Sequence, residues 1–221
     1  MRVITAALVL GLALLTAVEV ADLLVHVDNS VLDALVARRT AGWTNFMALM
    51  SHTGASVLTY PLVALAGVVV AWRTGRWRPG VFALAVVVLG VLSRLLLSVL
   101  VRDARPDRDL WLTHVGGFSF PSGHAAASAL LAGALIWLAG RAGLPRPARI
   151  VFAIVALTWA FLVGLSRLYL GVHWVTDVVG SWLLAAAWLS ALPLLDPERR
   201  EAVTAARPVS GPTGPPLEAD R

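Results

Sequence analysis

Two histidines, each in a short polar segment between long apolar runs, are the residues of this chain best suited to catalysis. His173 and Asp177 are four residues apart, so on a helix they share one face and the carboxylate can accept the proton of one ring nitrogen. That contact fixes the tautomer and leaves the other nitrogen free as a base or a nucleophile. His124 lies in the second polar segment, where it is available to donate a proton to a departing oxygen.

Four residues near these histidines have the donors that an anion requires. Ser122 and Gly123 stand at the predicted start of a helix, where free backbone N–H groups and the positive end of the helix dipole favour negative charge. Arg105 and Arg167 add planar guanidinium groups that can hold two phosphate oxygens at once. These residues predict a binding site for an anion of the size of a phosphoryl group.

Composition identifies the chain as a membrane protein. Hydrophobic residues make up 58% of the 221 residues and charged residues 14%, against roughly a quarter charged in an ordinary soluble domain. The basic residues are scattered among apolar segments and form no continuous stripe, which argues against nucleic acid as a partner. Cysteine is absent, which excludes a thiol nucleophile and a Cys-ligated metal site.

Six apolar stretches are long enough, or nearly so, to cross a hydrocarbon core of about 30 Å. They cover residues 3–27, 55–72, 81–101, 125–139, 150–165 and 178–195. The predicted fold is therefore an all-α integral membrane bundle of six helices, forming one domain over residues 1–197. The chain after Pro193 is rich in proline, glycine and charge, and residues 198–221 are predicted to be a disordered cytoplasmic tail.

The placement of arginine predicts how the bundle is oriented in the cell membrane. One face would hold eleven arginines, at positions 2, 73, 76, 78, 141, 146, 149, 199, 200, 207 and 221. The other face would hold six, at positions 38, 39, 102, 105, 108 and 167. The face with eleven is predicted to be cytoplasmic, together with both termini, so the loops with the candidate active-site residues are extracytoplasmic.

The N-terminal region allows alternatives. The first apolar stretch follows Arg2 and ends in small residues, as a cleaved signal peptide does, but it is long and has no clear Ala-x-Ala site, so a membrane helix is favoured. Apolar residues at helical spacing in residues 31–36 indicate an amphipathic helix. This helix either lies in the outer membrane interface or packs on the bundle.

Each candidate site residue also has a structural interpretation. A serine at a helix start is usually an N-cap, a His-x-x-x-Asp pair is commonly a structural hydrogen bond, and an arginine near a membrane often anchors lipid headgroups. The functional interpretation is favoured because three polar segments, with two histidines, two arginines and a carboxylate, are predicted at one membrane face.

The sequence Pro-Ser-Gly-His at 121–124, followed by Ser166, Arg167, His173 and Asp177 in the spacing Ser-Arg-x5-His-x3-Asp, resembles two signatures of a known family. They are the second and third signatures of the type 2 phosphatidic acid phosphatase (PAP2) family of membrane lipid phosphatases, which shares its site with vanadium-dependent haloperoxidases. The resemblance covers a catalytic core at about residues 81–195.

The resemblance implies a nucleophilic His173 that forms a phosphohistidine, with Asp177 orienting it and His124 acting as acid and then base. It also implies four phosphate-binding residues: Arg105, Ser122, Gly123 and Arg167. No metal or other cofactor is implied. The implied substrate is a phosphorylated lipid, namely phosphatidic acid, phosphatidylglycerol phosphate or an isoprenoid diphosphate such as undecaprenyl diphosphate. The same residues would also serve a lipid phosphotransferase, and a non-catalytic lipid-binding or transport protein is a further alternative.

The first signature departs from the family, which usually has Lys, six residues, then Arg-Pro. Counting back from Arg105 places Ser98 at the lysine position. Arg94 and Arg102 are each one helical turn from Ser98 and are candidates for the substitute charge. Arg94 lies well inside an apolar stretch, where an arginine indicates function. Its alternative is an ion pair with an acidic residue of the first helix, Glu19 or Asp22.

Overall fold

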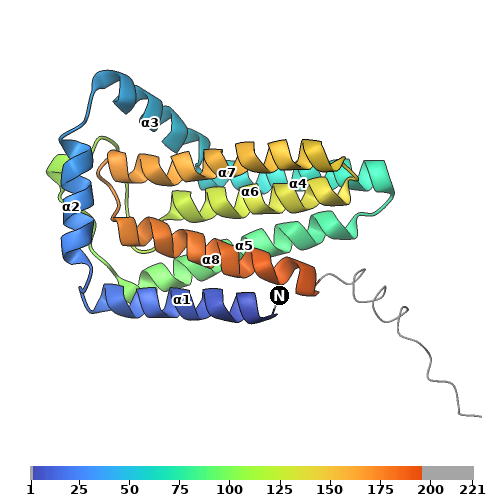
Figure 1. Cartoon of the computed structure of the whole chain (residues 1–221), viewed down its shortest axis with the longest axis horizontal. Helices are drawn as coiled ribbons and strands as arrows, with labels where there is room; N and C mark the ends of the chain where they lie inside the picture. The colour runs from blue at the N-terminus through green and yellow to red at the C-terminus, as the bar shows by residue number, and fades with distance from the viewer. Residues whose placement is uncertain (1, 196–221) are drawn as a thin grey trace, which may run out of the picture.

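The computed structural model describes residues 2–195, and every regular element in that part of the chain is a helix. Six helices are long and apolar enough to span a membrane. They are α1 (Arg2–Val20), α4 (Ser56–Thr74), α5 (Arg78–Val101), α6 (Gly123–Arg141), α7 (Arg146–Tyr169) and α8 (Val175–Leu195). The predicted all-α bundle of six spans is confirmed, and Figure 1 shows these helices running side by side. The predicted tail and its arginines lie outside the described residues.

The first predicted span is wrong at its C-terminal end. α1 stops at Val20, and Asp22 has a left-handed backbone conformation with φ of 53°, which a right-handed helix does not accommodate. The chain turns there and continues as α2 (Val25–Val36), which runs across the end of the bundle in Figure 1. The apolar residues after Val20 therefore belong to a turn and a second helix.

α2 packs on the end of the bundle, which is one of the two arrangements expected for the amphipathic segment. Its buried residues are Asp28 and Leu32. The Asp28 carboxylate accepts hydrogen bonds from the backbone N and the Oγ1 of Thr176, at 3.1 and 2.8 Å. Thr176 is in the first turn of α8, whose N–H groups have no partner within the helix. Asp28 therefore caps α8 from a different helix.

The hydropathy pattern does not indicate α3 (Ala41–Thr53), because polar residues such as Thr44 and His52 interrupt its apolar face. α3 packs against α7. Met47 and Ser51 are buried, and Trp159 Nε1 of α7 donates to Thr53 Oγ1 at 2.9 Å. This packing brings Ser51 next to residues at the C-terminal end of α7.

α6 is the central helix and contacts α4, α5, α7 and α8. The residues that allow this are small: Ala125, Ala126, Ala127, Ala132 and Ala134 are all buried. Gly133 faces Leu189 of α8 so closely that a Cβ at this position would overlap its side chain. Small residues let helices approach closely in membranes. The packing fixes the first turn of α6, which carries His124, in the middle of one end of the bundle.

All the polar signatures meet at that end of the bundle, on the left in Figure 1, where α5 is joined to α6 and α7 to α8. A single turn of 3-10 helix, η1 (Arg108–Leu110), lies in the first of these connections. Arg39 Nη2 donates to the backbone oxygens of Leu110 and Tyr169, at 2.9 Å each. Gly171 has φ of 74° and lies against Leu110 O, where a Cβ would overlap. Arg39 and Gly171 therefore hold the two connections together.

Candidate active site

His173 and Asp177 are in direct contact. The chain leaves α7 at Tyr169, turns at Gly171, and enters α8 at Val175, so His173 precedes α8 and Asp177 lies in its first turn. His173 Nδ1 is 2.9 Å from Asp177 Oδ2, and the two residues are 2% and 0% exposed. The carboxylate accepts the Nδ1 proton, which leaves Nε2 as the unprotonated nitrogen.

Asp177 has two further donors that its sequence spacing does not reveal. Its Oδ2 accepts hydrogen bonds from Ser119 Oγ at 2.5 Å and from the backbone N of Trp174 at 2.8 Å. Ser119 is fully buried. It is 58 residues from Asp177 in the sequence, and only its place just before the Pro-Ser-Gly-His signature hints at a role. Three donors on one oxygen hold the carboxylate, and with it the imidazole, in a single orientation.

The unprotonated nitrogen of His173 faces Arg105, whose Nη1 lies 3.0 Å from Nε2. The same guanidinium donates to the backbone oxygens of Gly116, Gly117, Phe118 and Val172. Burial lowers the pKa of His173 well below its usual 6.5, and the positive charges of Arg105, Arg167 and Arg94 lower it further. His173 is therefore a neutral imidazole surrounded by cations.

Two buried donors of the predicted phosphate site have no hydrogen-bond partner: Ser122 Oγ and Arg167 Nε. Ser122 is the N-cap residue of α6 by position, as the structural interpretation expects, but its side chain makes no capping hydrogen bond. Arg167 is 2% exposed, and its Nη1 donates to Ser51 Oγ, a contact that the sequence does not indicate. Buried donors without partners are rare in native structures, and these two remain able to donate to a ligand.

The structure separates the two candidates for the substitute charge. Arg94 Nε donates to the backbone oxygen of Pro121 at 2.7 Å, and a Cβ on Gly123 would lie 3.4 Å from its Cζ. Its guanidinium therefore lies against the Pro-Ser-Gly-His signature, and within the described residues it forms no ion pair with an acidic residue of α1. Arg102 is exposed, and its Nε donates to Val99 O of its own helix.

His124 is the second residue of α6 and is half-buried. Its strongest electrostatic interactions with other residues are with Arg167, His173, Arg94 and His52. The two catalytic candidates and two of the arginines thus share one site, and the helix N-terminus at Gly123 adds the positive end of its dipole. The chemistry that this arrangement supports is nucleophilic attack on a bound oxyanion, with a second histidine for proton transfer.

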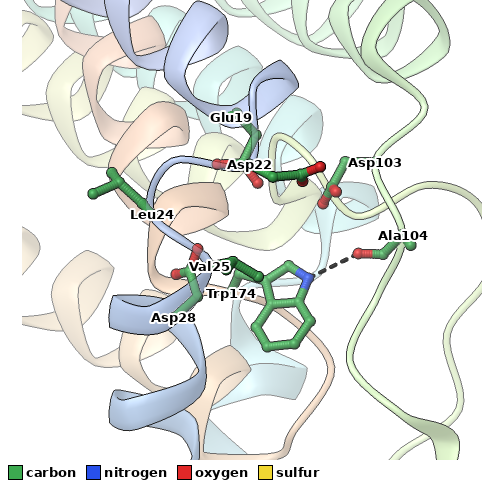
Figure 2. Close-up of a pocket in the computed structure, with 8 residues that line it drawn as sticks. All are labelled: Glu19, Asp22, Leu24, Val25, Asp28, Asp103, Ala104 and Trp174. Atoms are coloured by element: carbon green, nitrogen blue, oxygen red, sulfur yellow. Dashed lines mark hydrogen bonds between the residues drawn. The ribbon is translucent and has the colours of Figure 1, made fainter.

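A cluster of carboxylates adjoins this site. Oxygens of Glu19, Asp103 and Asp177 lie within 4.8 Å of one another. Glu19 and Asp103 line a cavity of about 160 Å³, and Figure 2 shows their carboxylates directed toward one another. Burial, and after it the charge of Asp177, raise the pKa of Asp103 to about 7. The sequence gives no sign of this cluster, because its members come from three distant segments.

Comparison with known proteins supports the same assignment of the fold. The sequence profile of the PAP2 superfamily matches residues 52–201. Phosphatidylglycerophosphatase B of Bacillus subtilis is 33% identical over 159 residues, which are 71% of this chain and 77% of that protein. Phosphatidylglycerophosphatase B of Escherichia coli is 39% identical over 108 residues, 48% of this chain but 35% of the relative. An undecaprenyl-diphosphatase of Sulfolobus acidocaldarius is 39% identical over 75 residues, 34% of this chain and 32% of the relative.

A solved structure resembles the whole bundle. The crystal structure of a transmembrane PAP2 type phosphatidylglycerolphosphate phosphatase from Bacillus subtilis superposes with a TM-score of 0.80 and 26% sequence identity. The match covers 93% of this chain and 98% of that one. With the family profile matching more than half of the sequence, the chain belongs to the PAP2 superfamily and is a multi-pass membrane phosphatase.

Proposed function

We propose that this protein hydrolyses the phosphate of a membrane lipid in two steps, through a phosphohistidine on His173. The observation that carries the proposal is the geometry around His173: Nδ1 is held by Asp177, and Nε2 faces Arg105 at 3.0 Å. Ser122 Oγ and Arg167 Nε are buried donors without partners, available to phosphate oxygens.

In the first step, the Nε2 lone pair attacks phosphorus and the bond from phosphorus to the lipid oxygen breaks. The phosphate displaces the Arg105 contact from Nε2, because that guanidinium otherwise occupies the attacking lone pair. His124 gives its proton to the departing lipid oxygen. The Asp177 carboxylate stabilises the imidazolium that forms as the N–P bond is made.

In the second step, His124 takes a proton from a water molecule, which attacks the phosphohistidine. The N–P bond breaks, the electron pair returns to Nε2, and inorganic phosphate leaves. Arg94, Arg105 and Arg167 stabilise the charge on the phosphoryl oxygens in both steps, because positioned donors in a water-poor site act most strongly where charge develops.

We propose phosphatidylglycerol phosphate as the first substrate to test. The relative that shares the larger part of its length with this chain is named phosphatidylglycerophosphatase B, whereas the undecaprenyl-diphosphatase match covers 34% of this chain. Phosphatidic acid and undecaprenyl diphosphate present the same phosphoryl group and are the necessary comparisons.

We also propose that the active site faces the extracytoplasmic side. Among the described residues, arginines 2, 73, 76, 78, 141, 146 and 149 belong to the end of the bundle away from the active site, where α4 is joined to α5 and α6 to α7. Arginine accumulates on the cytoplasmic side of membrane proteins.

The nucleophile is tested by the His173→Ala variant with a panel of phosphatidylglycerol phosphate, phosphatidic acid and undecaprenyl diphosphate. We expect release of inorganic phosphate to fall by about a thousandfold or more, because the covalent step is lost. Wild-type enzyme denatured at alkaline pH during turnover of ³²P-labelled substrate should carry label on His173, because the N–P bond of a phosphohistidine is stable in base and hydrolyses in acid. The matched control is His26→Ala, at an exposed position of α2, which should retain full activity. Unchanged phosphate release by His173→Ala would exclude this mechanism, and label found in a second lipid would indicate transfer in place of hydrolysis.

Arg94→Ala should lower kcat/KM by about tenfold to a hundredfold, because a charged donor to the phosphate is worth about 1.5–3 kcal/mol. Arg94→Lys should recover part of the loss, which separates the charge from the hydrogen bond to Pro121 O. Arg102→Ala, which removes an exposed arginine one helical turn beyond Ser98, is the control and should stay within about twofold of wild type. Equal losses in Arg94→Ala and Arg102→Ala would contradict the assignment of Arg94.

The dependence of kcat/KM on pH follows from the lowered pKa of His173. Attack requires the neutral imidazole, and a lowered pKa keeps the imidazole neutral into acid solution, so activity should persist as pH falls through 6.5. The measurement is kcat/KM between about pH 4 and about pH 9, with ionisation of the substrate phosphate followed by ³¹P NMR in parallel. A fall of kcat/KM in acid with its midpoint at or above pH 6.5, at a pH that differs from the ionisation of the substrate, would show that the pKa of His173 is not lowered.

The orientation is tested with single cysteines, since the chain has none of its own. A membrane-impermeant maleimide should label His114→Cys, in the exposed loop before α6, in intact cells. It should label Trp77→Cys, in the loop between α4 and α5, only after the cells are permeabilised. The reverse pattern would place the active site in the cytoplasm.

A further inference from the structure

A polar cavity lies beside the candidate active site, at the same end of the bundle. Its volume is about 160 Å³, and its polar lining is acidic: Glu19, Asp22, Asp28 and Asp103. Figure 2 shows these carboxylates around one space, with Trp174 on one side. We call this cavity the acidic pocket. The phosphatase mechanism uses none of these four carboxylates.

Two carboxylates that line the acidic pocket, Glu19 and Asp103, adjoin Asp177, which does not line it. Oxygens of these three carboxylates lie within 4.8 Å of one another. Glu19 lies in the last turn of α1, Asp103 follows α5, and Asp177 lies in the first turn of α8. Within residues 2–195, neither Glu19 nor Asp103 forms an ion pair with a basic side chain. Arg105 places positive charge, and His173 a hydrogen-bond donor, on one side of Asp177, but on the side of Glu19 and Asp103 the three partly or fully buried carboxylates repel one another.

An independent observation indicates that a positive partner belongs here. Asp177 is 0% exposed, and its Oδ2 takes three hydrogen bonds while its Oδ1 takes none. The Oδ2 of Asp103 is also buried without a partner. A buried carboxylate oxygen can accept only from a donor or a cation, and no donor of the described chain reaches these two atoms.

The number of carboxylates favours calcium over magnesium. Three carboxylate oxygens within 4.8 Å of one another are close enough to bind one cation together. Magnesium gives up its water molecules reluctantly and usually takes one or two carboxylates, whereas calcium accepts about six to eight oxygen ligands in a flexible arrangement. A site with three carboxylates therefore suits calcium.

The surrounding contacts hold the ligands in place without an ion. Trp174 Nε1 donates to Ala104 O at 2.8 Å, which fixes the residue after Asp103 against the start of α8. Both oxygens of Asp28 are engaged by Thr176, so Asp28 supports the pocket and is not a ligand. The cavity leaves room for the water molecules that complete a calcium shell.

We propose that one divalent cation of the calcium size binds between Glu19 and Asp103 of the acidic pocket and the adjoining Asp177. The ion joins α1, the loop after α5 and the first turn of α8, and it uses Asp177 Oδ1 while Oδ2 continues to hold His173. This binding site is independent of the lipid substrate, so it can be measured on the protein alone.

The experiment uses the full-length protein in neutral detergent after treatment with EDTA. Titration with Ca²⁺, followed by isothermal calorimetry and by thermal unfolding, should show one saturable site per chain and a rise in Tm. Mg²⁺ should bind at least about tenfold more weakly. Glu19→Gln and Asp103→Asn should each weaken Ca²⁺ binding by at least about tenfold and abolish the rise in Tm. Asp33→Asn, at an exposed position of α2 outside the pocket, is the control for loss of one negative charge and should bind as wild type.

Cooperative thermal unfolding of the variants in EDTA shows that they are folded. Wild-type protein with no saturable Ca²⁺ binding would overturn the site, and so would Ca²⁺ binding unchanged in Glu19→Gln and Asp103→Asn. Tighter binding of Mg²⁺ than of Ca²⁺ would overturn the assignment of ion size. Loss of phosphate release in His173→Ala has no bearing on these outcomes, so the proposed function and the cation site fail independently.

Discussion

The carboxylate of Asp177 is the constraint on which the rest of the active site depends. One of its oxygens accepts from His173, from Ser119 and from the backbone N of Trp174. Its backbone oxygen accepts from the N of Ser122 at 3.2 Å. The start of α8, the loop after α5 and the start of α6 are thereby fixed relative to one another. Because Asp177 is 0% exposed, water does not compete for these bonds, which are stronger in a medium of low dielectric.

The arginines around His173 place several positive charges close together in a largely buried site. Arg167 is 2% exposed and has a donor without a partner, and the charges of Arg94, Arg105 and Arg167 all act on His173. Burying cations costs free energy unless they are paired, so the arginines must be held by the scaffold. The close packing around the small residues of α6 supplies that scaffold, and α3 adds Ser51 as a partner for Arg167. In the proposed mechanism, a bound phosphate is the negative partner that completes the pairing.

The sequence predicts the parts of this architecture that depend on local spacing. Hydropathy predicts the six spans, and the four-residue separation predicts the contact of His173 with Asp177. The position of Arg94 inside an apolar stretch indicates a functional role for that arginine. The sequence does not predict the hydrogen bond of Ser119 with Asp177, which are 58 residues apart, or that of Ser51 with Arg167, which are 116 residues apart. Those contacts exist only because helices pack side by side, and α3 itself has too little hydropathy to be recognised. The hydropathy pattern does not show the break after Val20 either, since apolar residues continue through the turn at Asp22, whose backbone is left-handed.

Asp177 also connects the two polar sites. On the side of Oδ2, His173 and Arg105 place positive charge and hydrogen-bond donors. Glu19 and Asp103 bring their carboxylate oxygens close to it as well. Like charges at this distance disfavour an ionised carboxylate, and in the proposed mechanism the imidazolium of His173 needs that carboxylate ionised. Whatever neutralises Glu19 and Asp103 therefore acts on His173, the proposed nucleophile, through Asp177.

A cation on the free oxygen of Asp177 removes the repulsion without breaking any of the three hydrogen bonds that orient His173, whereas a proton on Asp177 itself would weaken them. The arrangement thus explains why a carboxylate at the centre of the active site keeps one oxygen free of hydrogen bonds.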